Sequence, residues 1–107
     1  MSKAILELNS KIMSLKAKKH LAATDLVKIR LGVRKLARHR TILRKKIRDQ
    51  QTATEMLYAR SRLNPSMRIP HAKAMETLRN LELSERGLTT AILAHRKFLE
   101  TTNKKEK

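Results

Sequence analysis

The residues of this sequence best suited to chemistry are lysines and arginines that crowd into one segment. Residues 28–48 hold ten Lys or Arg and no Asp or Glu, in a chain of formal net charge +17. Ammonium and guanidinium groups attract phosphate, and Arg can bind it through two hydrogen bonds at once. We therefore predict that nine side chains contact nucleic-acid phosphates: Lys28, Arg30, Arg34, Lys35, Arg38, Arg44, Lys45, Lys46 and Arg48.

We do not expect these contacts to read nucleobases. Tyr58 and Phe98 are the only aromatic residues, so single-stranded bases would have few rings to stack on. The chain has no helix-turn-helix or RRM signature, and its basic residues are interleaved with apolar ones, unlike those of a bZIP protein. The sequence predicts a small, non-catalytic subunit of a nucleoprotein assembly that contacts RNA or DNA through the backbone.

Two other kinds of partner also suit a basic helix. The chain could dock, as a helical adaptor or inhibitor, on an acidic surface or cleft of a larger protein machine, and its five methionines suit such an adaptable interface. A basic amphipathic helix could also lie on an anionic membrane. The narrow apolar stripe and the absence of Trp disfavour the membrane.

Catalysis and metal binding are not expected. The four histidines, His20, His39, His71 and His95, never pair at helical spacing, and no acidic residue completes a metal site with them. The chain lacks cysteine, a nucleophile turn, a Gly-rich phosphate loop and a carboxylate pair suited to acid–base work. We predict neither an enzyme nor a bound cofactor, and we expect His95 to be a core-edge histidine.

The basic residues are positioned by a long apolar stripe. Thirteen positions follow one another at alternating spacings of three and four, and eleven of them are apolar: Ile5, Leu8, Ile12, Leu15, Lys19, Ala22, Leu26, Ile29, Val33, Leu36, Arg40, Leu43 and Ile47. Heptad spacing of this kind predicts a helix that buries one seam against another helix. We expect the helix over about residues 3–62.

A second helix follows a turn. Asn64-Pro65-Ser66 should break the first helix, and Pro70 suits the start of the next, which predicts a turn over 63–70. We expect a helix over about 71–102, continuous through Gly87, and a charged tail over 103–107. Its stripe is Ala74, Leu78, Leu81, Glu85, Leu88, Ile92, His95 and Leu99. The predicted fold is all-α: a long antiparallel helical hairpin or coiled coil, in a single domain of residues 1–107.

The two predicted helices differ in length. At a rise of about 1.5 Å per residue, the second helix spans just under about 50 Å and the first roughly 85–90 Å. The second helix therefore cannot cover the N-terminal seam, which consists of Ile5, Leu8, Ile12, Leu15 and Ala22. Either the first helix breaks near Thr24, with Thr24 as a cap and residues 3–22 folded back as a third helix, or another molecule covers the seam, as in a homodimer or a larger complex.

Antiparallel pairing gives the acidic residues a role. It places Glu82 and Glu85 level with residues 45–48, and Glu100 level with Arg30 or Arg34. We expect these acids to neutralise one flank of the basic helix in part.

We expect a soluble cytoplasmic protein. No apolar run reaches the roughly 18–20 residues that a membrane span requires. The N-terminal MSKAILELNSK lacks the continuous apolar region of a signal peptide.

Overall fold

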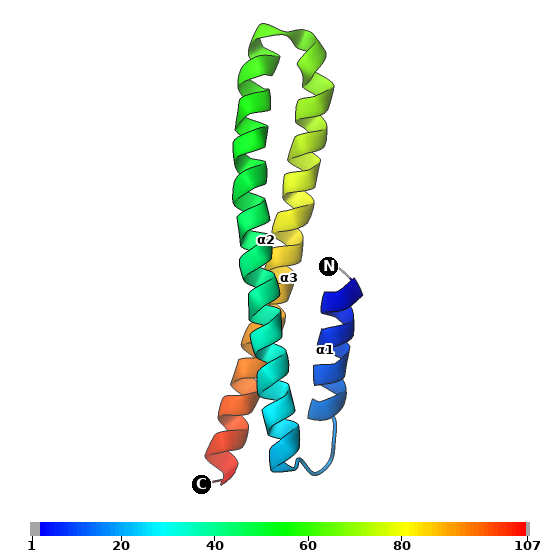
Figure 1. Cartoon of the computed structure of the whole chain (residues 1–107), viewed down its shortest axis with the longest axis vertical. Helices are drawn as coiled ribbons and strands as arrows, with labels where there is room; N and C mark the ends of the chain where they lie inside the picture. The colour runs from blue at the N-terminus through cyan, green and yellow to red at the C-terminus, as the bar shows by residue number, and fades with distance from the viewer. Residues whose placement is uncertain (1–2, 107) are drawn as a thin grey trace. The chain divides into compact units, whose positions relative to one another are not determined.

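The fold is all-α, as predicted. The computed structural model describes residues 3–106, with side chains over residues 3–102. This range contains helix α1 (Lys3–Lys16), helix α2 (Ala23–Leu63), a short 3-10 helix η1 (Pro65–Met67) and helix α3 (Arg68–Glu106), shown in Figure 1. The predicted helical hairpin with a third, N-terminal helix is confirmed, and α3 passes through Gly87 without a break.

Three of the predicted boundaries are wrong. A continuous helix over 3–62 does not form, because residues 17–22 separate α1 from α2. The turn is shorter than 63–70, since α3 already begins at Arg68. At its other end α3 extends past Thr102 to Glu106, in a lysine-rich segment whose positive charge favours a helix C-terminus. Lys107 lies outside the described residues.

The helices form two compact units. Among the described residues, unit 1 comprises residues 3–40 and 87–106, and unit 2 comprises residues 41–86. α2 and α3 contribute residues to both units, whereas α1 belongs to unit 1 alone.

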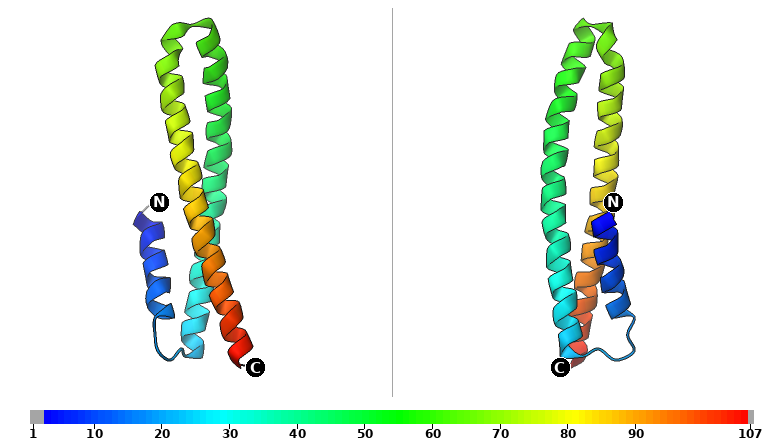
Figure 2. Two further views of the ribbon diagram at one scale, coloured as in Figure 1. Left: turned by 180° about the vertical axis from the view of Figure 1, so that it is seen from behind. Right: turned by 45° about the vertical axis from the view of Figure 1, so that its right-hand side comes forward.

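Unit 1 is a three-helix arrangement of α1, the first part of α2 and the last part of α3. Each helix contributes its predicted stripe to the core. The buried core side chains are Ile5, Ile12, Leu26, Ile29, Val33, Leu36, Leu88, Ile92 and His95. In Figures 1 and 2, α1 runs alongside the start of α2. The apolar seam of residues 3–16 is thus buried against other helices of the same chain. Folding back to bury this seam is the physical reason for the break after α1.

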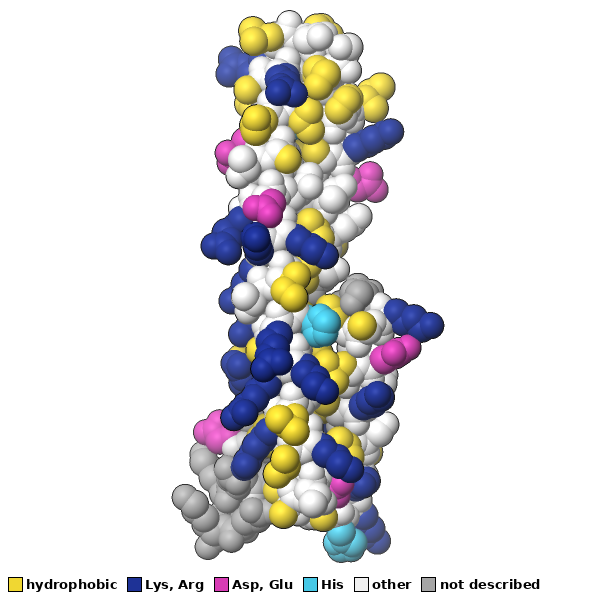
Figure 3. All heavy atoms as spheres, viewed as in Figure 1, with side chains coloured by type: hydrophobic (Ala, Val, Ile, Leu, Met, Phe, Trp, Pro, Cys, Tyr) yellow, Lys and Arg dark blue, Asp and Glu magenta, His cyan; other side chains and the backbone are white. Residues whose placement is uncertain are grey.

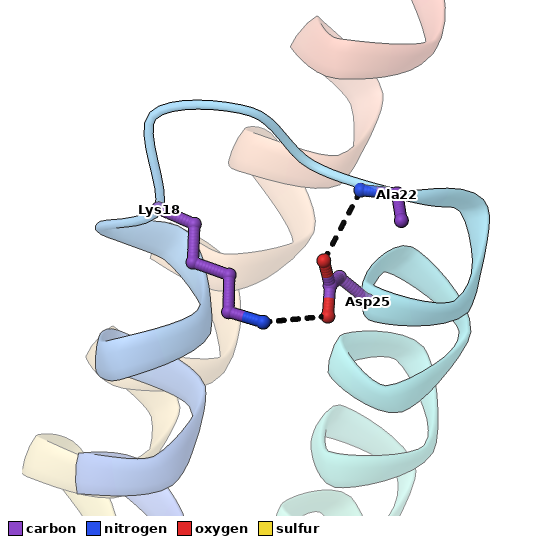
Figure 4. Close-up of polar contacts among 3 residues, drawn as sticks. All are labelled: Lys18, Ala22 and Asp25. Carbon is purple, nitrogen blue, oxygen red and sulfur yellow. Dashed lines mark hydrogen bonds and ion pairs between the residues drawn. The ribbon is translucent and has the colours of Figure 1, made fainter.

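The start of α2 is fixed by Asp25 (Figure 4). Its carboxylate Oδ2 accepts a hydrogen bond of 3.1 Å from the backbone N–H of Ala22, and its Oδ1 lies 3.0 Å from the Lys18 ammonium. A side chain at the third helical position that reaches back to the residue before the helix is half of a capping box. Asp25, rather than the predicted Thr24, therefore caps this helix. The Lys18 contact and the Ala22 N–H lower the pKa of Asp25 below its ordinary value.

Unit 2 is a hairpin of two antiparallel helices. At the turn, the Asn64 side-chain oxygen accepts hydrogen bonds of 3.1 Å from the Ser66 backbone and 2.8 Å from the Ser66 hydroxyl, which holds Pro65 at the start of η1. Both views of Figure 2 show α2 and α3 side by side as they leave this turn.

The interface of the unit 2 hairpin is thin and partly polar. Thr54 and Ala74 are its buried residues, whereas the apolar stripe positions Leu43, Ile47, Leu57, Leu78 and Leu81 are only half-buried. Gln50 Nε2 bridges the helices, 3.3 Å from the Ala74 carbonyl and 3.4 Å from Thr54 Oγ1. Two helices without a third cannot enclose their seam, so the apolar stripe stays accessible to water.

Candidate nucleic-acid interface

In unit 1, five of the predicted basic residues project from α2 into solvent. All five are exposed, and we call them basic set 1: Lys28, Arg30, Arg34, Lys35 and Arg38. Over the same turns of helix, the stripe Leu26, Ile29, Val33 and Leu36 is buried. Because residues three and four apart share one face of a helix, burial of the stripe leaves the intervening basic side chains on the outside.

In unit 2, the remaining four predicted basic residues are also exposed. We call them basic set 2: Arg44, Lys45, Lys46 and Arg48. The adjoining stripe positions Leu43 and Ile47 are half-buried. Basic set 2 therefore repeats in unit 2 the arrangement found in unit 1.

Arg44 has an acidic partner. Its Nε lies 2.9 Å from Glu85 Oε1 across the hairpin, with the Arg44 side chain 54% exposed and that of Glu85 20% exposed. The prediction placed Glu85 level with residues 45–48, and the observed partner lies one residue earlier. Beside the pair, Arg48 and Arg86 help to line an open groove of about 620 Å³. The groove offers guanidinium groups to an anion, while Glu82 and Glu85, which also line it, offset part of their charge.

The space-filling view shows the same distribution. On the face drawn in Figure 3, Lys and Arg side chains follow α2, with few acidic side chains among them. No Asp or Glu occurs between residues 26 and 48. On α2 itself, the acids nearest to the basic sets are Asp25 and Asp49, at the two ends of this stretch, and Asp25 interacts with the charge of Lys28.

The predicted N-terminal seam is largely closed inside unit 1. Ile5 and Ile12 are buried, and Leu8 and Leu15 are half-buried. Ala22 does not belong to this seam, because it lies in the loop between α1 and α2 and is exposed. Covering these residues therefore does not require a second molecule.

His95 is a buried histidine held by two partners that the sequence did not reveal. Its Nε2 lies 2.7 Å from Asn9 Oδ1, and its Nδ1 lies 3.1 Å from the Lys16 ammonium. Since an ammonium only donates, Nδ1 accepts and Nε2–H donates, which is the neutral ring. Burial, together with the charge of Lys16, lowers the pKa of His95. Lys16 Nζ also lies 5.1 Å from the centre of the Phe98 ring.

The other histidines do not gather with His95. His20 is exposed and His39 half-buried, while the ring of His71 lies 5.5 Å from that of Tyr58. In the part of the chain that the structure describes, no three His, Asp or Glu side chains could together hold a metal ion.

Neither family models, nor curated proteins, nor solved structures match this chain. Within residues 3–106, none of the helices combines the length and the apolar character needed to cross a membrane. The side chains themselves, and above all the exposed basic sets, are therefore the indication of function that the protein offers.

Proposed function

We propose that this protein binds the phosphate backbone of nucleic acid through basic sets 1 and 2, without reading nucleobases. One observation carries the proposal: all nine predicted side chains of α2 are exposed, in a stretch of sequence that contains no acid. Lysine and arginine that neutralise phosphates release condensed counterions, and this release supplies most of non-specific affinity.

The spacing within each set suits a regular row of phosphates. In basic set 1, Lys28 and Lys35 are separated by two helical turns, or about 10 Å along the axis, and Arg34 and Arg38 by about 6 Å. Duplex DNA presents one negative charge per roughly 1.7 Å of its axis, so a short contact already meets several phosphates. The near absence of aromatic residues favours a duplex or a structured RNA over a single strand.

A protein of this kind acts by holding nucleic acid rather than by transforming it. We therefore propose a non-catalytic, small subunit of a cytoplasmic nucleoprotein assembly. The formal net charge of +17 supports this role, because such a chain needs a polyanion nearby to relieve its own repulsion.

A salt-dependent titration tests the proposal. Labelled duplex DNA and a structured RNA hairpin are titrated with the protein at several salt concentrations. We expect the logarithm of the binding constant to fall with the logarithm of salt concentration, with a slope of about −0.9 for each phosphate contacted on B-form DNA. A triple substitution of Arg34, Arg38 and Lys45 to Glu should weaken binding and make the slope shallower by about one for each phosphate that the variant no longer neutralises.

The control is a variant with the same charge change outside α2. Lys3, Arg96 and Lys97 are exposed on α1 and α3, and their replacement by Glu removes the same number of positive charges. We expect this variant to keep the salt slope of the unmodified protein. Equal losses in the two variants would show that net charge alone drives binding, and the basic sets would then not form a site.

A further inference from the structure

The turn end of the unit 2 hairpin exposes large apolar side chains. Leu63 is 91% exposed and Ile69 69%, and Met56, Tyr58 and Met75 are each about half exposed. We call residues 56–75 the hairpin tip. Figure 3 shows hydrophobic side chains gathered at the end of the molecule that holds the turn. Scattered exposed apolar residues are ordinary, but a group of them at one end of a hairpin is a candidate interaction surface.

A concave apolar groove adjoins the tip. It has a volume of about 560 Å³. Tyr58, His71, Met75 and Leu78 form its apolar wall, and Glu55, Arg79 and Glu82 also line it. The groove exists because the helices meet through small side chains there, Thr54 on α2 and Ala74 on α3, which are both buried. Tyr58 and His71 form one end, with their rings inclined by 48°.

The tip is also positively charged. Residues 56–75 contain Arg60, Arg62, Arg68 and Lys73, all exposed, and no Asp or Glu. Over residues 54–82, which include the whole groove lining, five Lys or Arg outnumber three Glu, so the charge of this surface stays positive. A partner must therefore bring both apolar side chains for the groove and negative charge for its surroundings.

Three kinds of occupant fit poorly. A second copy of this chain would bring its own net charge of +17 against the basic tip. Nucleic acid has charge but no apolar side chains to fill the groove. A lipid surface has both, but a flat bilayer does not project into a concave groove. A convex apolar ridge with acidic flanks is the shape of an amphipathic helix.

We propose that the hairpin tip and its groove bind an acidic amphipathic helix of a partner protein. Apolar residues of that helix, spaced three and four apart, would fill the groove beside Met75 and Leu78. Its acidic residues would face the arginines of the tip. Residues 54–63 of α2 span about 15 Å, which corresponds to about three turns of the partner.

This surface adjoins the proposed phosphate contacts along α2. Thr54, the first residue of its groove, follows Arg48 by about 9 Å, and Glu82 lines both this groove and the one beside Arg48. Unit 2 thus presents the two surfaces next to each other and could join a phosphate backbone to an acidic protein helix.

Synthetic helical peptides provide the test. We would use fluorescently labelled, stapled peptides with Leu, Met or Phe at the apolar positions and Glu on both flanks, and measure polarisation against the full chain. Saturable binding is expected for the acidic peptides. A matched set with Lys in place of Glu should bind at least about tenfold more weakly, as unlike charges favour association and like charges oppose it.

Two variants locate the peptide. Met75→Glu places a carboxylate in the groove, and we expect it to weaken peptide binding about tenfold or more, because it leaves an unpaired charge against an apolar ridge. Leu93→Glu is the matched control, since Leu93 is exposed on α3 in unit 1, and it should leave peptide binding unchanged. Circular dichroism would establish that both variants keep their helices.

Several outcomes would overturn the proposal. These are equal binding of the acidic and basic peptides, no saturable binding of any acidic peptide, or loss of binding in Leu93→Glu as much as in Met75→Glu. Tighter binding to vesicles of phosphatidylglycerol and phosphatidylcholine, abolished by Met75→Glu, would instead assign the tip to membranes. DNA binding is measured in parallel. Met75→Glu should leave it unchanged, so failure of the tip proposal is distinguishable from failure of the phosphate proposal.

Discussion

Gly32 of α2 and Ile12 of α1 lie so close that a β-carbon at position 32 would be 2.8 Å from Ile12 Cγ1 and 2.9 Å from Cδ1. Ile12 is 1% exposed, and its Cγ1 and Cδ1 atoms would have to shift to admit that β-carbon. A glycine inside a helix costs roughly 0.5–1 kcal/mol relative to alanine. The chain keeps this weaker helix former at position 32, and α1 packs closely against α2 as a result.

We predict that Gly32→Ala destabilises the protein, although alanine is the better helix former. Overpacking a tight site typically costs about 1–3 kcal/mol, which exceeds the gain of about 1 kcal/mol in helix propensity. Urea unfolding monitored by circular dichroism measures the difference. In an Ile12→Ala background the same substitution should become neutral or stabilising, because the clashing atoms are gone. A Gly32→Ala protein more stable than the parent would show that α1 is not held against α2 at this point.

The capping role of Asp25 predicts an order of stability. Asp25→Asn keeps an acceptor for the Ala22 N–H but loses the charge facing Lys18, and Asp25→Ala loses both. We therefore expect the melting temperature to fall in the order parent, Asp25→Asn, Asp25→Ala. Thr24→Ala is the control and should change it little, because Thr24 is exposed and Asp25 makes the capping bond. A larger fall in melting temperature in Thr24→Ala than in Asp25→Ala would show that Thr24 caps the helix instead.

The same carboxylate contributes to the acid sensitivity of the fold. Because the pKa of Asp25 is lower in the folded chain than its ordinary 3.8, folding favours the ionised form. The contribution of the Asp25 carboxylate to the stability of the fold is fully present above the ordinary pKa. It is lost as the pH falls through the lowered pKa. In Asp25→Asn, we expect the acid-unfolding curve below about pH 4 to be shallower than in the parent. Identical curves would contradict this assignment.

His95 predicts a second loss of stability, at milder pH. Burial and the nearby Lys16 ammonium lower its pKa below the ordinary 6.5, so the unfolded chain takes up a proton before the folded chain does. The contribution of the neutral His95 ring to the free energy of unfolding is therefore fully present above about pH 6.5, and it is lost as the pH falls toward the lowered pKa. Urea midpoints between about pH 7.5 and 5.5 measure this loss. His95→Gln should flatten that dependence, and Lys16→Met should reduce it, whereas His20→Gln, at an exposed site, should leave it intact.

The ion pair between Arg44 and Glu85 contributes modestly to the unit 2 hairpin. Charge reversal by Glu85→Arg sets two guanidinium groups against each other, and we expect a loss of about 0.2–1 kcal/mol, the usual range for an exposed pair. The double variant Arg44→Glu with Glu85→Arg should recover part of that loss. A double-mutant cycle on melting temperatures gives the coupling between the two residues. No change in Glu85→Arg would mean that the pair does not set the register of the hairpin.

The apolar stripes were sufficient to predict the helices and most of the core. Heptad spacing indicates directly which side of a helix packs against another helix. The stripe positions of α2 in unit 1 are all buried, as this spacing predicts: Leu26, Ile29, Val33 and Leu36. The break between α1 and α2 was predicted near Thr24 as one of two alternatives, and the structure has it over residues 17–22, directly before α2 begins at Ala23. The sequence did not decide between the alternatives, because residues 17–22 contain neither Gly nor Pro. The break follows from the burial of Ile5 and Ile12, which is a tertiary effect that local sequence does not record.

The candidate surfaces were predicted unequally. Exposure of the basic sets followed from the position of the stripe, since every one of those residues lies off it. The hairpin tip was not predicted, because the apolar stripe found in the sequence ends at Ile47 and carries no expectation for the side chains around the turn. Gln50 and Thr54, polar residues at stripe positions, were the available signal that the seam opens in unit 2. The partners of His95 could not be found, because Asn9 and Lys16 lie 86 and 79 residues away in the chain.

The polar, shallow interface of unit 2 has a consequence for amide hydrogen exchange. Amides over residues 26–36 lie beside a three-helix core and should exchange only when unit 1 opens. Those over residues 50–60 depend on a seam in which Thr54 is the one buried residue that this segment of α2 contributes. One uninterrupted helix would then show slow exchange near its beginning and fast exchange toward its end. The slow segment would hold basic set 1 as a rigid template, and the fast segment would let the tip reshape itself around what it binds.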